Sequence, residues 1–422
     1  MLILFYHISL PMQPKTLMKI AGIIAEYNPF HNGHRYHIEQ TRRRTGCDAV
    51  VVVMSGDFVQ RGVPAVTDRF LRAEAALRCG ADVVLELPVY GATASAEDFA
   101  SAGIRALTAL SCVDIVSYGA EDATGADGCN TFRETAQFLL DDPEDFHSEL
   151  LSHVREGNSY AKARSLALSE FRPEAAELLS KPNNILAVEY EKAILASGSK
   201  LSTCAIPRSD RGYHDTAVDE LCSATAIRES LSAEGRIPAV AVPEEASALY
   251  ASLNAENAVS ADDFSDMLFA ELSAHTTASL SALYDIPEDL ANRILEAAKR
   301  PFTWTSLAES VKCKAYTRTR IDRALCHTLL RLTRKDADIF RKELPYLRVL
   351  GFRRDAEDLI AEMEKSSKVP LLVRFLRDSA KLSGDAERFL STDLRASALY
   401  SQVLYRKAGI LREDARRRLL TV

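Results

Sequence analysis

Three absences in the sequence exclude whole classes of protein. No uninterrupted apolar run approaches the roughly 18–20 residues that a membrane-spanning helix needs, so we expect no membrane span. The eight cysteines form no CxxC pair, and the two nearest, Cys313 and Cys326, are 13 positions apart. That spacing argues against a zinc ribbon or a redox motif. The net charge of -7 excludes a generally basic nucleic-acid coat protein but is compatible with a local basic patch.

The residues that are present describe a globular protein of the cytoplasm. The chain has 422 residues, of which 47% are hydrophobic, and this is enough for two or three domains with a real core. The widely spaced cysteines indicate reduced, mostly buried thiols rather than a disulfide framework. Residues 1–17 contain a short apolar run with no basic start and no cleavage site. We therefore interpret them as an extension before Met18, and a signal peptide is the weaker alternative.

Short apolar runs alternate with helical patterns from residue 19 onward. Thr67 is expected to cap one helix, and Ser95 with Asp98 has the spacing of a capping box for another. The alternation predicts an α/β fold with a Rossmann-like, doubly wound parallel sheet. Ligands of such sheets bind beyond the carboxyl ends of the strands. Four apolar runs have the length and β-branched content of buried parallel strands: residues 19–25, 48–54, 82–87 and 114–118.

The pattern of elements changes further along the chain. Helices are expected across residues 124–180, with breaks at Pro143 and Pro173, and then at 184–196, before a fifth strand at 202–206. From about residue 236 the pattern is mostly α-helical. Three parts are therefore predicted: an N-terminal extension (1–17), an α/β domain (18–235) and a helical C-terminal domain (236–422).

The strongest functional signal follows the first predicted strand. His31 and His34 are three positions apart at the start of a helix, so both lie on one face of its first turn. A helix N-terminus offers unpaired N–H groups to a phosphate, and Gly33 has no side chain to keep a nucleotide away from the backbone. Two imidazoles here would donate to phosphoryl oxygens as charge develops. The alternative is a chance pair of histidines near a turn.

A second motif has the character of an anion clamp. Ser223 and Thr225 supply hydroxyl groups at the start of a predicted helix, and Arg228 follows one turn later. This stretch resembles the S-[ST]-T-x-[IV]-R element that closes over ATP phosphates in adenylyltransferases. Alone, it would equally describe an ordinary helix cap followed by a solvated arginine.

Together these motifs resemble a known family. HxGH is the signature of the nucleotidyltransferase superfamily, which implies the nucleotidyltransferase type of sheet. The chain as a whole is similar to the bacterial tRNA(Met) cytidine acetate ligase family. Besides residues 25–37 and 223–228, the similarity is carried by four segments: Ser55–Gly62, Lys181–Ala187, Ile206–Asp215 and Leu347–Phe352.

The resemblance implies an ATP-dependent ligase with two steps. Such enzymes activate acetate to acetyl-adenylate and pass the acetyl group to N4 of the wobble cytidine of elongator tRNA(Met). Mg²⁺ is expected with the ATP phosphates. His31 and His34 are the implied catalytic residues, with Ser223, Thr225 and Arg228 as a further phosphate clamp. The implied ATP-binding residues are Ile24, Ala25, Glu26, Tyr27, Asn28, Pro29, Phe30, His31, Asn32, Gly33, His34, Arg35, Tyr36, His37, Gly119, Asn183, Asn184 and Arg208.

Several assignments stay open at the level of sequence. Asn184 is preferred over its neighbour Asn183, although the pattern does not separate them, and the alternative role of Asn184 is to cap a helix. Pro207 beside Arg208 departs from the family pattern and leaves the local backbone there in doubt. Asp57 and Glu26 are candidates for a helper carboxylate in acetyl transfer. The oligomeric state is not predicted.

The RNA side of the function depends on charge. Eight basic residues lie within 312–335, opposed in sequence only by Asp322, and a second basic cluster occupies 406–418. Such runs are usually solvated helix faces, but their concentration in an acidic chain favours a phosphate-binding surface. Base-stacking partners are expected but cannot be named. The candidate tRNA-binding residues are Lys312, Lys314, Arg318, Arg320 and Arg323.

Two other functions compete with this interpretation. A small-molecule adenylyltransferase acting on a nicotinamide- or pantetheine-type phosphate would use the same motifs, but would leave the helical C-terminal region without a role. A catalytically inert RNA-binding scaffold would have no need to keep His31, Gly33, His34 and Arg228.

Overall fold

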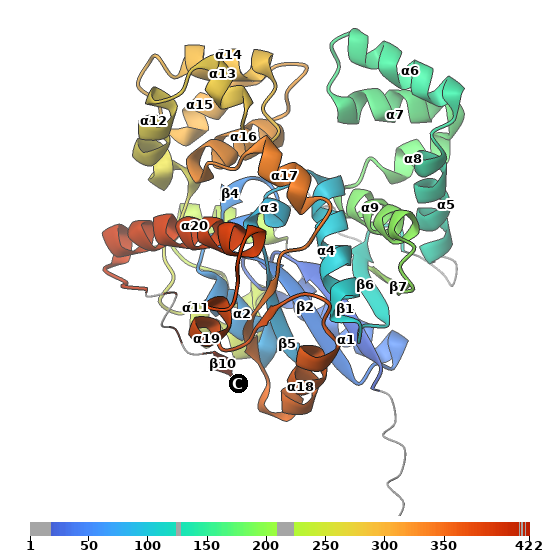
Figure 1. Ribbon diagram of the computed structural model, residues 1–422, viewed down its shortest axis with the longest axis vertical. Coiled ribbons are helices and arrows are strands. Elements are labelled where there is room, and N and C mark those ends of the chain that lie inside the picture. Colours follow the sequence, from blue (N-terminus) through green and yellow to red (C-terminus); the bar gives the residue numbers. More distant parts are fainter. Residues whose placement is uncertain (1–17, 124–127, 209–222, 413, 415–416, 418) are drawn as a thin grey trace, which may run out of the picture.

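The structure, a computed structural model, describes residues 18–123, 128–208, 223–412, 414, 417 and 419–422. At its centre lies a sheet in the order β10-β8-β5-β2-β1-β6-β7, and β9 pairs with β8 beside this path (Figure 1). The strands are β1 (Ile20–Ala25), β2 (Ala49–Ser55), β5 (Val83–Leu87), β6 (Ile115–Ala120), β7 (Ser202–Pro207), β8 (Leu347–Phe352), β9 (Leu371–Leu372) and β10 (Leu420–Thr421). A hairpin of β3 (Phe58–Val59) and β4 (Val63–Pro64) follows β2.

The five strands predicted from apolar runs form a parallel sheet with a core on both faces. β2 pairs in parallel with β1 and β5, and β6 pairs in parallel with β1 and β7. Every residue of β2 is buried. Val51 and Val53 pack in one apolar cluster, whereas Val50 and Val52 pack in another, because successive side chains of a strand point to opposite faces. The predicted α/β fold class is confirmed.

Helices cover both faces of this sheet. One face carries α1 (Asn32–Thr45), α2 (Arg69–Arg78) and α11 (Glu244–Tyr250), and the other carries α3 (Val89–Ala92), α4 (Ala96–Leu110) and α9 (Pro182–Ser197). Ser95 caps α4 as predicted. The predicted cap at Thr67 is wrong by one residue, because the carboxylate of Asp68 accepts the N–H groups of Phe70 and Leu71 at the start of α2.

The chain after residue 236 is mostly helical, as expected, but it also contributes strands that the sequence did not predict. β8 pairs antiparallel with β5, and β10 pairs in parallel with β8, so the C-terminal region extends the sheet of the α/β domain. The run Leu347–Phe352 was recognised only as a family segment, since one short strand among many helices gives a weak signal. The boundary at residues 235–236 stays a prediction.

Two groups of helices stand beyond the carboxyl ends of the parallel strands (Figure 1). The first comprises α5 (Gly128–Asp141), α6 (Glu144–Arg155), α7 (Tyr160–Phe171) and α8 (Pro173–Leu178). The second comprises α12 (Ser265–Ser273), α13 (Thr277–Ser281), α14 (Glu288–Ala297), α15 (Trp304–Val311), α16 (Arg318–Leu330) and α17 (Arg334–Phe340). In Figure 1, α6 and α7 lie at the upper right and α12 to α16 at the upper left, whereas α5 runs down beside α9 and α17 lies between the two groups.

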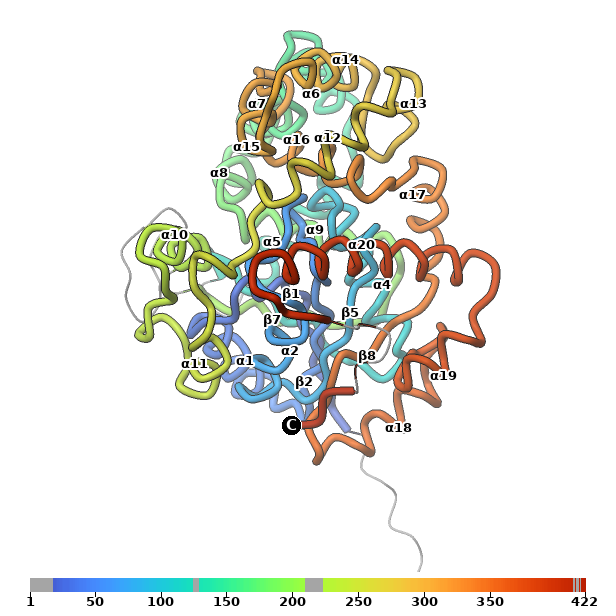
Figure 2. Tube along the Cα trace, turned by 90° about the vertical axis from the view of Figure 1, so that its left-hand side faces the viewer, coloured from blue at the N-terminus to red at the C-terminus, as the bar shows by residue number. Residues whose placement is uncertain are grey.

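Four further helices lie outside these two groups. They are α10 (Ala224–Glu234), seen beside α11 in Figure 2, and α18 (Glu357–Ser366), α19 (Phe375–Ser379) and α20 (Asp385–Ala408). Within the part of the chain that the structure describes, no helix has the length and apolar character needed to cross a membrane. The seven cysteines in that part are free thiols, of which three are buried and four are partly buried, so the expectation of mostly buried thiols is not met.

A buried ion-pair network ties the C-terminal segment to the loop after β2. The guanidinium of Arg412 donates to both carboxylate oxygens of Asp57, at 2.9 and 2.5 Å, and Arg69 pairs with the same carboxylate at 2.5 Å. Burial alone would raise the pKa of Asp57, but Arg412 and Arg69 outweigh it and hold this pKa well below its usual range. Arg412 is therefore a structural residue rather than part of an exposed RNA-binding surface.

Arg412→Met is expected to lower the free energy of unfolding by about 3–5 kcal/mol, the usual cost of removing one partner from a buried ion pair. Because the pKa of Asp57 is depressed in the folded state, the stability that this pair contributes is present at neutral pH and is lost on acidification. Urea unfolding at several pH values measures both effects. Arg406→Met, at an exposed position of α20, is the matched control. If Arg412→Met lowers the free energy of unfolding by less than about 1 kcal/mol, the ion pair with Asp57 does not stabilise the fold as a buried pair would.

Candidate active site

One cavity of about 700 Å³ lies at the carboxyl ends of the parallel strands. Its floor is formed by the ends of β1, β6 and β7 and by the first turn of α1. Its walls come from α7, α9, α10 and α16, so both upper groups of helices contribute to it. This location agrees with the rule for ligand sites in doubly wound sheets.

His31 and His34 hold each other at the start of α1. His31 is the N-cap, and its Nδ1 atom accepts the backbone N–H of Gly33 at 3.0 Å. Nδ1 of His34 accepts the backbone N–H of His31 at 3.2 Å. The pair therefore makes a capping box in which imidazoles replace the usual hydroxyl and carboxylate. Because each Nδ1 atom is an acceptor, each neutral ring carries its hydrogen on Nε2 and can donate from there.

The surroundings of both rings favour the neutral form of histidine. Burial, together with the charges of the nearby Arg208 and Arg228, lowers the pKa of His31 to about 3. Burial, with the charges of its neighbours, also holds the pKa of His34 well below its usual range. The sequence-based expectation of hydrogen-bond donors rather than acid–base groups is thus consistent with this environment.

Gly33 is required by the histidine pair itself. A Cβ atom at this position would lie 2.8 Å from Cε1 of His31 and 3.1 Å from its Nδ1. Any larger residue would push the capping imidazole out of place. The sequence suggested close approach of a nucleotide to the backbone, and the structure adds this second reason for glycine.

The proposed phosphate clamp reaches the histidine loop directly. Ser223 caps α10 through its hydroxyl, which accepts the N–H of Ala226. Arg228 donates to the carbonyl oxygen of Asn28 at 2.7 Å and to the hydroxyl of Thr225 at 3.0 Å. These contacts bring α10 against the loop after β1, although the two segments are 200 residues apart. Ser223, Thr225 and Arg228 all line the cavity.

The part of the cavity floor beside the histidines is formed by the ends of β6 and β7. Gly119 and Arg208 line the cavity, and the Arg208 guanidinium donates to the side-chain oxygen of Asn183 at 3.4 Å. Pro207 continues β7, where it is paired with Ala120 of β6. Because β7 is the edge strand, the missing N–H of a proline costs no sheet hydrogen bond. The departure from the family pattern therefore leaves the strand intact.

The two neighbouring asparagines have different roles. Asn183 lines the cavity. Asn184 is fully buried, where its side-chain oxygen accepts the N–H of Glu121 and its amide donates to Asp122 and to the carbonyl of Leu178. Its side chain thus holds the loop after β6 against α9, and does not line the cavity. The preference for Asn184 is not supported by this placement.

Most of the residues predicted to bind ATP do line the cavity. Four others from the histidine segment do not, because they lie on the opposite side of the loop and helix. Phe30 is buried in the core, Arg35 pairs with Glu39 and Glu245, and Asn32 donates to the carbonyl of Val240. Pro29 is the fourth. Those on the cavity are Ile24, Ala25, Glu26, Tyr27, Asn28, His31, Gly33, His34, Tyr36, His37, Gly119, Asn183 and Arg208.

The candidate tRNA-binding residues divide into two sets. Arg320 and Arg323 line the same cavity as the histidines, which the sequence did not predict. Lys312 and Arg318 pair with Glu309, and Lys314 donates to the carbonyl of Glu156. Glu309, just before this stretch, and Asp285, further away in sequence, thus oppose the cluster in addition to Asp322.

The two candidate helper carboxylates, Asp57 and Glu26, lie in different surroundings. Asp57 is held by Arg412 and Arg69 and does not line the cavity, so the suggestion that it assists acetyl transfer is wrong. Glu26 does line the cavity, and its carboxylate accepts the N–H of Gln60 at 2.9 Å. Gln60 and Arg61, at the tip of the β3–β4 hairpin, line the cavity as well. The family segment Ser55–Gly62 had marked this hairpin, without indicating its role.

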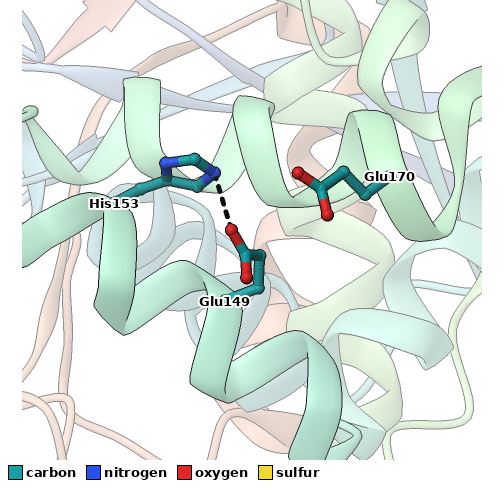
Figure 3. A group of neighbouring side chains, drawn as sticks. All are labelled: Glu149, His153 and Glu170. Atoms are coloured by element: carbon teal, nitrogen blue, oxygen red, sulfur yellow. Dashed lines mark ion pairs between the residues drawn. The ribbon is translucent and has the colours of Figure 1, made fainter.

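A separate group of side chains has the composition of a metal site. Glu149 and His153 of α6 face Glu170 of α7, and their ligand atoms lie within 4.8 Å of one another (Figure 3). His153 is 3.2 Å from Glu149, so an ion pair accounts for their approach without a metal. None of the three lines the cavity. This group therefore does not fit a magnesium ion that accompanies ATP.

Fold and site together define a nucleotidyltransferase of the HxGH class. The sequence profile of the family described as HIGH Nucleotidyl Transferase matches residues 18–414. A tRNA(Met) cytidine acetate ligase of Thermoanaerobacter sp. is 35% identical over 401 residues, which cover 93% of this chain and 97% of that protein. The protein of the same name from Bacillus subtilis is 33% identical, with coverage of 91% and 92%. The chain belongs to the tRNA(Met) cytidine acetate ligase family.

Solved structures agree with this assignment. TmcAL of Thermotoga maritima without ligand superposes with a TM-score of 0.83 at 29% sequence identity, covering 92% of this chain and 95% of that one. The same protein bound with alpha-thio ATP gives a TM-score of 0.81 at 30% identity. Membership in this family removes the support for a nicotinamide- or pantetheine-type adenylyltransferase.

The two asparagines are separable by substitution. Asn183→Ala is expected to weaken ATP binding several-fold with little change in stability, because its side chain faces the cavity. Asn184→Ala is expected to lower the free energy of unfolding by about 1–3 kcal/mol, because it removes the acceptor of the partly buried N–H groups of Glu121 and Asp122. Titration calorimetry with ATP and urea unfolding test the pair. If Asn184→Ala instead weakens ATP binding and Asn183→Ala lowers stability, Asn184 is the residue that contacts ATP.

Proposed function

We propose that this chain activates acetate with ATP and transfers the acetyl group to N4 of the wobble cytidine of elongator tRNA(Met). One observation carries the proposal: a single cavity contains both the HxGH motif and basic residues of α16. A ligase that passes a reactive acyl-adenylate to an RNA base needs both substrates in one enclosed space. The tRNA substrate places the proposed reaction in the cytoplasm.

In the first step a carboxylate oxygen of acetate attacks the α-phosphorus of ATP, and pyrophosphate leaves. Charge develops on the oxygens around the α-phosphorus, where the Nε2–H groups of His31 and His34 are proposed to donate. Arg208 and Arg228, both partly buried, are proposed to hold the phosphates. Fixed donors of this kind need no reorganisation as the charge develops.

In the second step N4 of cytidine attacks the acetyl carbon, the bond to the AMP oxygen breaks, and N4 loses one proton. AMP is a good leaving group, so positioning supplies much of the rate. Mg²⁺ is proposed to enter with ATP and to neutralise the phosphate charge. Glu26 is the carboxylate on the histidine loop that faces the cavity and could contact that ion.

The histidine pair provides the first test. His34→Ala is expected to lower acetate-dependent ATP–pyrophosphate exchange by about 10²–10³, with a much smaller loss of ATP affinity, because its contact strengthens only as charge develops. Thermal unfolding controls for loss of the capping box. The assignment would be overturned by near-normal acetyl-adenylate formation in the His31→Ala/His34→Ala double variant.

The lowered histidine pKa values provide the second test. Since the pKa of His31 is about 3 and that of His34 lies well below its usual range, both rings are neutral in the free enzyme throughout pH 6–8. The value of kcat/KM for ATP reports the free enzyme, so it should show no histidine titration in this interval. A limb near pH 6.5 that disappears in His34→Gln would contradict the neutral-donor role.

A further inference from the structure

The end of the cavity away from the histidines is enclosed by two helices from different parts of the chain. Tyr160 and Arg164 of α7 line one wall, and Arg320 and Arg323 of α16 line the other. The two helical groups meet at Lys314, whose Nζ donates to the carbonyl of Glu156 at 3.1 Å. α7 and α16 therefore flank one space beneath this contact.

Tyr160 differs from the other aromatic residues of the cavity in its exposure. It is the first residue of α7, which Ser159 caps. Tyr160 is 55% exposed, whereas Tyr27, Phe99, Tyr118 and Tyr190 are buried and Tyr36 is only partly exposed. A half-exposed ring on a helix end that faces a cavity offers a free surface on which a base can stack.

The opposite wall carries more positive than negative charge. Asp285 pairs with both Arg320 at 3.1 Å and Arg323 at 3.8 Å. The Arg323 side chain is only 12% exposed, and its Nε atom is buried with no hydrogen-bond partner among the residues that the structure describes. Within this part of the chain the buried guanidinium is thus incompletely hydrogen-bonded, and an anion entering the cavity would compensate its charge.

Arg323 is also fixed relative to the histidine site. Gly62 of the β3–β4 hairpin has a φ of +74°, and a Cβ atom there would lie 2.3 Å from Cα of Arg323. The hairpin and α16 are therefore in backbone contact. Two residues before Gly62, the N–H of Gln60 holds the Glu26 carboxylate on the histidine loop. The cation and the nucleotide end of the cavity are thus connected through one short hairpin.

We propose that Tyr160 and Arg323 form the RNA end of the cavity, where Tyr160 stacks on the unpaired pyrimidine base and Arg323 binds a phosphate that flanks it. This inference rests on the proposed function. It supplies the stacking partner that the sequence could not identify. An extruded base needs an aromatic surface, and its backbone needs a cation, and these two walls offer one of each.

The test uses the full-length chain and a transcript of the elongator tRNA(Met) anticodon stem–loop. Tyr160→Leu should lower kcat/KM for the RNA by about 10- to 100-fold, the effect expected when one aromatic stack is lost. Tyr160→Phe should restore most of it. Tyr405→Leu on α20 removes an equally exposed tyrosine, at 55%, that does not line the cavity, and should have no effect.

Arg323→Gln should raise the KM for the RNA and make the salt dependence of its binding shallower by about one unit of slope. Arg78→Gln, at an exposed position of α2 where the arginine pairs with Glu74, is the control. Acetate-dependent ATP–pyrophosphate exchange should be unchanged in both cavity variants. If the wild-type chain shows no acetate-dependent ATP–pyrophosphate exchange, the proposed function itself is refuted.

Two results would overturn the RNA site while leaving the ligase intact. If Tyr160→Leu lowers exchange as much as RNA acetylation, the ring contacts ATP instead. If both cavity variants acetylate the stem–loop with normal KM, kcat and salt slope, the RNA enters elsewhere. Circular dichroism and thermal unfolding separate either result from misfolding.

Discussion

The active site depends on the exchange of hydrogen bonds between His31 and His34 in the first turn of α1. By capping the helix through Nδ1, the two rings satisfy backbone N–H groups that would otherwise be stranded at a buried helix start. The same bonds fix the tautomer and leave Nε2–H as the remaining donor on each ring. Gly33 is required because any Cβ atom would meet the His31 ring. Local folding and adenylyl transfer thus require the same residues at positions 31, 33 and 34.

The surroundings convert this motif into a neutral donor pair. Burial and two arginines, Arg208 and Arg228, disfavour a proton on His31. Those arginines come from the end of β7 and from α10, far along the chain. The loop after β1 therefore depends on segments that fold back against it, and Arg228 does so through a direct bond to the carbonyl of Asn28. The C-terminal residue Arg412 braces the neighbouring loop through Asp57.

The sequence predicted the features that arise from local pattern. Buried apolar runs gave the five parallel strands, and the HxGH spacing gave the cavity floor. Cooperation between distant segments could not be predicted, because it leaves no periodic signal. β8 is a short strand among helices, the carboxylate that pairs with Arg320 and Arg323 comes from Asp285 outside α16, and Tyr160 belongs to no motif. Asn183 and Asn184 are identical in type, and only burial separates them.

The central claim is that acetate itself attacks the α-phosphorus of ATP in this cavity, and that one of its oxygens stays with AMP. Turnover with ¹⁸O-labelled acetate and the anticodon stem–loop tests this directly by mass spectrometry of the products. The account predicts one ¹⁸O atom in each AMP released and none in pyrophosphate. Unlabelled AMP, or formation of ADP with label in inorganic phosphate, would contradict it.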